Sequence, residues 1–69
     1  MTNRQELINL ISELEERDPE HGEADVVLIF ADQYAPDGWE TDDEFNIYDY
    51  ARSMPVEYMA VIREYMAEL

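Results

Sequence analysis

The sequence VVLIF at residues 26–30 is an uninterrupted apolar run, and its conformation decides the fold class. Such a run is typical of a buried strand or of the middle of a buried helix, and periodicity alone does not separate the two. No other segment has the pattern of a strand, and a lone strand would leave its backbone hydrogen-bonding groups unpaired. We therefore expect residues 24–35 to form a central helix buried on most sides, with Leu28 and Ile29 beside its main apolar face. A strand at 26–30 would instead give an α+β fold.

The segment before this run has the pattern of an amphipathic helix. Leucine and isoleucine recur at helical spacing through residues 2–17. At its start, Thr2 with Gln5, or Asn3 with Glu6, is a candidate capping pair. These features predict a first helix over residues 2–17.

The remaining segments are divided by turn signals. Residues 18–23 contain proline and glycine and predict a connection, and residues 36–39, Pro-Asp-Gly-Trp, predict a turn. Residues 41–44, Thr-Asp-Asp-Glu, have the pattern of a capping box and predict a third helix over residues 42–52. A proline suited to a first helical turn opens the fourth predicted helix, residues 55–68.

Together these patterns predict an all-α fold, a compact bundle of three to four short helices in a single domain that spans residues 1–69. A domain of this size buries only roughly 60% of the surface that its unfolded chain exposes, so its core is thin. The chain has no cysteine, which excludes disulfides, a thiolate zinc site and a catalytic thiol.

Charge is the strongest signal in the sequence. The chain has 18 acidic residues, four arginines and no lysine, and its formal net charge is -14 at pH 7. Such an excess repels phosphates and anionic lipids, which argues against direct binding of nucleic acid or membrane. Eight aromatic residues within a 46% apolar composition indicate a folded chain rather than a disordered one. With no signal-peptide pattern and no apolar segment of about 20 residues, we expect a cytoplasmic location.

Catalytic and metal-binding patterns are weak. His21 is the only histidine, so neither a two-histidine zinc site nor a convincing serine triad can be assembled. An EF-hand loop that began at Gln33 would place Asp37, Gly38 and Glu44 at matching positions, but its first and third positions lack the required oxygen ligands. We expect no enzymatic activity, no cofactor and no metal site.

Two dense acidic runs, at residues 13–25 and 37–49, remain as candidate contact sites. A row of carboxylates can resemble duplex DNA, which carries one phosphate charge per ~1.7 Å of helix axis. Aromatic residues interleaved with carboxylates also suit an interface with arginine side chains. The candidate partner-binding residues are Glu15, Glu16, Asp18, Glu20, Glu23, Asp37, Glu40, Asp42, Asp43 and Glu44.

In size, acidity and lack of lysine the whole chain resembles the small phage-encoded inhibitors of host defence, including the anti-CRISPR and anti-restriction proteins that mimic DNA. The resemblance lies in composition rather than in a motif, so it assigns no individual residue. It implies a stoichiometric inhibitor that occupies the basic nucleic-acid channel of an effector complex in the host cytoplasm. The expected partner is thus a basic nucleic-acid-binding protein or complex.

Two other interpretations fit the same composition. One is a small acidic structural or protein-interaction module, in one version responsive to calcium through Asp37 and Glu44. The other is a halophilic housekeeping domain, in which acidic residues adapt the surface to a salt-rich cytoplasm. Such a domain should unfold when salt is removed.

Overall fold

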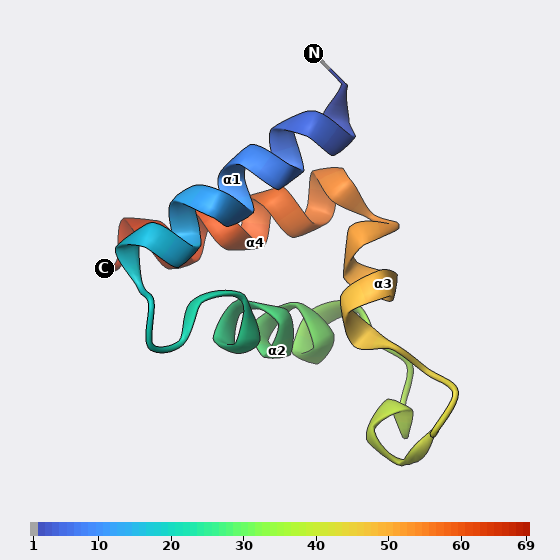
Figure 1. The fold of residues 1–69 in the computed structure, drawn as a ribbon. Coiled ribbons are helices and arrows are strands. Elements are labelled where there is room, and N and C mark those ends of the chain that lie inside the picture. Colours follow the sequence, from blue (N-terminus) through green and yellow to red (C-terminus); the bar gives the residue numbers. More distant parts are fainter. Residues whose placement is uncertain (1) are drawn as a thin grey trace.

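The computed structural model describes residues 2–69, and its regular structure in this range is entirely helical (Figure 1). The elements in chain order are α1 (Asn3–Arg17), α2 (Gly22–Tyr34), the short 3-10 helix η1 (Trp39–Thr41), α3 (Ile47–Arg52) and α4 (Pro55–Ala67). The predicted all-α fold is therefore confirmed. Residues 26–30 lie within α2, so the α+β alternative was wrong.

The three long helices pack around one core. In Figure 1, α1 and α4 lie side by side and run in the same direction, whereas α2 runs back beneath them. The short helix α3 follows the loop that leaves the end of α2, and it leads to the start of α4. None of the helices in residues 2–69 has both the length and the apolar character that crossing a bilayer requires.

The core forms where the apolar faces of the helices meet. Leu14 of α1, Phe30 of α2 and Ile62 of α4 are completely buried. Phe30 stacks on Tyr34 with a ring-centroid distance of 4.8 Å and meets the edge of Tyr58 at 5.3 Å. Aromatic packing thus joins α2 to α4 at the centre of this thin core.

The helix starts test the capping predictions. Thr2 caps α1, because its Oγ1 accepts a hydrogen bond from the Gln5 backbone N–H at 3.2 Å, as expected. The third helix begins at Ile47 rather than Asp42. Its cap is Asn46, whose side chain accepts from two backbone N–H groups. The capping box predicted at residues 41–44 was therefore wrong.

A polar cluster joins α2, α3 and α4. The Glu23 carboxylate is almost fully buried and accepts hydrogen bonds from Arg52 Nη2 at 2.8 Å and Nε at 3.3 Å. It also accepts one from the Tyr58 hydroxyl at 2.8 Å. The bonds to Glu23 raise the pKa of Arg52, while burial and then the Glu23 bond raise the pKa of Tyr58. Glu23 therefore belongs to the interior of the bundle, within α2 rather than in the connection predicted at residues 18–23.

Candidate functional site

Most of the predicted contact residues lie on the surface, but two of the ten do not lie there freely. Glu23 is occupied inside the bundle, and Asp18 is partly buried, with its Oδ2 accepting a hydrogen bond from the Tyr65 hydroxyl at 2.5 Å. The exposed ones fall in two groups. We define the acidic corner as Glu15, Glu16 and Glu20, and the acidic loop as residues 36–46, which include Asp37, Glu40, Asp42, Asp43 and Glu44.

The two groups lie at opposite ends of the molecule. The acidic corner lies where α1 leads into α2, and the acidic loop projects beyond the far end of α2, next to α3 (Figure 1). The spacing of the two acidic runs in the sequence does not show whether they form separate patches or meet along one side. The arrangement of the helices separates them, so one compact partner surface would contact one group at a time.

Local hydrogen bonds give the acidic loop a defined shape. The Thr41 hydroxyl donates to the Gly38 carbonyl at 3.0 Å, and Asp42 Oδ1 accepts from the Glu44 backbone N–H at 3.0 Å. Gly38 has a φ of 82°, a conformation that favours glycine. These bonds turn the backbone tightly and leave the carboxylates on the outside.

Aromatic contacts attach the same loop to the bundle. The partly buried Trp39 and Phe45 rings lie 6.2 Å apart, and Phe45 lies 5.2 Å from Tyr50 of α3. The Tyr50 hydroxyl in turn donates to the Tyr34 carbonyl at the end of α2. The loop carboxylates are therefore presented on an anchored segment.

Few carboxylates have a basic partner. Among residues 2–69, a basic side chain comes within 4.0 Å of a carboxylate in three pairs: Arg17–Glu13 at 4.0 Å, Arg52–Glu23 at 2.8 Å and His21–Asp25 at 3.6 Å, the last an ion pair only when His21 is protonated. None of these pairs includes a residue of the acidic loop. The negative potential of the loop is thus left uncompensated by neighbouring side chains.

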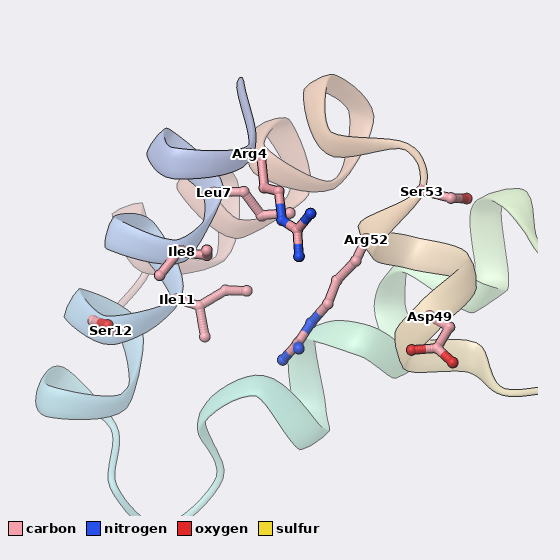
Figure 2. A pocket seen from close by; sticks show the side chains of 8 residues that line it. All are labelled: Arg4, Leu7, Ile8, Ile11, Ser12, Asp49, Arg52 and Ser53. Carbon is pink, nitrogen blue, oxygen red and sulfur yellow. The ribbon is translucent and has the colours of Figure 1, made fainter. Parts of the chain in front are cut away.

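Two of the four arginines gather elsewhere, at a groove between α1 and α3 with a volume of about 500 Å³. Figure 2 shows the Arg4 side chain of α1 and the Arg52 side chain of α3 extending into this space, which the apolar Leu7 and Ile11 of α1 also line. Asp49 also lines the groove, and Arg52 is held by Glu23. The nearby carboxylates offset the positive charge, so the groove is not a strong anion site.

A second surface was missed by prediction from sequence. Leu28 and Ile29, expected to lie within a helix buried on most sides, are 55% and 39% exposed on the outside of α2. Ile29 lines two shallow hollows, of about 430 Å³ toward Trp39 and about 150 Å³ toward α4. We call this surface the α2–α4 face. The residues lining the two hollows are Leu28, Ile29, Ala31, Asp32, Gln33, Trp39, Glu40, Val61, Glu64, Tyr65 and Glu68.

The part of the chain that the structure describes contains no group of three or more His, Cys, Asp or Glu side chains arranged to hold a metal ion. Comparisons with known proteins assign no function. No family model matches the chain, and neither a curated protein nor a solved structure matches it significantly. The exposed surfaces of the chain are therefore what indicates its binding partners.

Proposed function

We propose that this chain is a non-enzymatic binding protein that inhibits a basic, nucleic-acid-binding partner by mimicking the charge of DNA. Phage anti-CRISPR and anti-restriction proteins provide the pattern for this proposal. The target would be the basic channel or groove in which a defence complex holds nucleic acid. The chain would act stoichiometrically, by occupying that surface.

The observation that carries the proposal is the acidic loop. Its five carboxylates are exposed, lie on a segment anchored by Trp39 and Phe45, and have no basic side chain within 4.0 Å among residues 2–69. Phosphate-binding surfaces present lysine and arginine in a similar uncompensated way. Because the backbone of the loop is anchored, little backbone entropy is lost when its carboxylates bind such a surface, which favours a preorganised mimic.

Long-range electrostatics support the same partner class. A net charge of -14 on a chain of 69 residues attracts basic surfaces over several ångströms and repels nucleic acid. Salt screens this attraction, with a Debye length of about 10 Å at 0.1 M ionic strength. Binding that depends on charge mimicry should therefore weaken as salt is raised and should compete with DNA.

The test is an affinity pull-down from a bacterial lysate with three forms of the tagged protein. The loop variant reverses three charges (D37K, D43K and E44K) and keeps Asp42, whose side chain shapes the turn. The control variant reverses three charges of the acidic corner (E15K, E16K and E20K), which changes the net charge equally. Circular dichroism checks that all three forms are helical.

We expect the unaltered protein to recover a nucleic-acid-binding protein that elutes with salt and is displaced by duplex DNA. The loop variant should lose this partner, and the corner variant should retain most of it. If nothing basic is recovered, or if DNA does not compete, charge mimicry is wrong. If the corner variant alone loses the partner, the acidic corner, and not the acidic loop, is the surface that mimics DNA.

A further inference from the structure

The outward side of α2 has the pattern of a helix that packs against another helix. Asp25, Leu28, Ile29, Asp32 and Gln33 follow one another at helical spacing, with two large apolar residues between acidic ones. Helices that pack together use such a stripe, in which ridges of side chains fit between ridges of the partner. Within residues 2–69, Leu28 and Ile29 are left largely exposed for apolar residues of their size.

The surface around this stripe is shaped to accept side chains. Ile29 stands between the two hollows of the α2–α4 face, so an apolar side chain can enter on either side of it. Trp39 forms part of one hollow, and Val61 with Tyr65 of α4 forms part of the other. Apolar anchors in such hollows, surrounded by polar residues, are typical of helix-in-groove recognition.

The charges around the hollows favour a positively charged partner. Asp32 and Glu40 line the first hollow, and Glu64 and Glu68 line the second. No arginine or histidine lines either hollow in the described part of the chain. If a second copy of this chain packed against this face through its own α2–α4 face, its carboxylates would meet the same four carboxylates, and the two copies would repel each other. Phosphates and anionic lipid headgroups would be repelled as well.

We infer that the α2–α4 face binds a basic amphipathic helix, with leucine-sized residues in the hollows and arginine or lysine residues facing Asp32, Glu40, Glu64 and Glu68. This inference rests on the proposed function and extends it. Such a helix would belong to the same basic partner, and this chain would recognise it by apolar contacts as well as by charge. Apolar contacts are not screened by salt, so this part of the binding persists where charge mimicry alone fails.

The experiment uses two synthetic peptides of the same composition, about five helical turns long. In one, leucines are spaced three and four residues apart and arginines flank this stripe on both sides; in the other, the order is scrambled. Titration calorimetry measures the Kd of each for the full chain at low salt and at about 0.5 M NaCl, where the Debye length is only a few ångströms. At the higher salt, we expect the amphipathic peptide to bind at least about tenfold more tightly than the scrambled peptide.

Substitutions then locate the site. The L28Q and I29Q double variant keeps good helix formers and the net charge, and should weaken the amphipathic peptide by about tenfold or more. The matched control is V56Q on α4, because Val56 is as exposed as Leu28, at 56% against 55%, and lies outside both hollows. Thermal unfolding of both variants confirms that they fold, and V56Q should bind like the unaltered chain.

Equal affinity for the two peptides, or equal loss in V56Q, overturns the inference. These outcomes leave the proposed function standing if the loop variant D37K, D43K, E44K still loses the DNA-competed partner. Conversely, selective binding of the amphipathic peptide supports the inference even if no DNA-competed partner is recovered. In that case only the proposed charge mimicry is wrong. If neither peptide binds at low salt, the inference is wrong.

Discussion

Tyr65 and Asp18 show how one contact ties the ends of two helices. The Tyr65 hydroxyl donates to Asp18 Oδ2 at 2.5 Å, which joins the end of α4 to the residue that caps α1. This hydrogen bond, followed by partial desolvation and the negative charges of Asp18 and Asp25, raises the pKa of Tyr65 to about 12 from an ordinary value of 10.0. The folded state therefore holds the phenol proton more strongly than the unfolded state does.

The sign of the resulting pH dependence follows from linkage. Because the folded-state pKa is the higher one, the contribution of this contact is fully present below about pH 10 and is lost as the pH rises through about 12. We expect D18N to move the ionisation of Tyr65 down toward pH 10. Phenolate absorbance, titrated in the unaltered chain, D18N and Y65F, measures this shift. An unchanged titration in D18N would mean that Asp18 is not the cause.

Glu23 shows what a sequence conceals at the level of single residues. It stands in an acidic run and was predicted to contact a partner, but its bonding partners are Arg52 and Tyr58, 29 and 35 positions later. Nothing local distinguishes it from the 17 other carboxylates. Only the packing of α2, α3 and α4 brings an arginine and a phenol to it. By contrast, eight of the ten candidates, all except Glu23 and Asp18, are exposed, and their polarity alone predicts this.

At the scale of elements, local patterns predicted α1, α2 and α4 with ends close to those observed. The start of α3 was wrong because two short-range arrangements compete for the same residues. Asp42 can cap a helix, but here it accepts from the Glu44 N–H and closes a turn that lets Phe45 pack near Trp39 and Tyr50. Asn46 then takes the capping role.

This competition can be measured with two alanine substitutions. N46A removes the acceptor for the N–H groups of Tyr48 and Asp49 and should lower the free energy of unfolding by about 1 kcal/mol. T41A removes only an exposed bond to the Gly38 carbonyl and should change it by less than about 0.5 kcal/mol. Urea unfolding followed by circular dichroism gives both values. A larger loss in T41A than in N46A would mean that the Thr41 bond contributes more to stability than the Asn46 cap.

The exposure of Leu28 and Ile29 has a different cause. The run at residues 26–30 is apolar on every side of its helix, which favours burial on every side. A bundle with three long helices can cover only part of the surface of α2, and Val26, Val27 and Phe30 occupy the covered part. The sequence therefore predicted the helix correctly but could not predict how many neighbours would surround it.

At the scale of the whole molecule, the charge opposes compaction. The net charge is -14, and among residues 2–69 two arginine–carboxylate pairs lie within 4.0 Å, so the folded chain concentrates like charges that are further apart when it unfolds. Added salt screens this repulsion and should stabilise the fold. The buried core supplies stabilisation that does not depend on salt.

We expect the chain to be folded at low salt and its Tm to rise by about 4–8 °C in about 0.5 M NaCl, as for a gain of about 1 kcal/mol in a domain this small. The loop variant D37K, D43K, E44K carries less net charge and should show a smaller rise. Differential scanning calorimetry or thermal circular dichroism measures both. Unfolding on removal of salt would instead favour the halophilic domain.

The parallel arrangement of α1 and α4 has a consequence for the order in which the domain can form during translation. The apolar side of α1, with Leu14 completely buried, is covered by α2 and by α4, the last helix of the bundle to be synthesised. A nascent chain that ends before Pro55 would expose the part of that side covered by α4 to chaperones and proteases. The domain can therefore complete its core only after α4 leaves the ribosome.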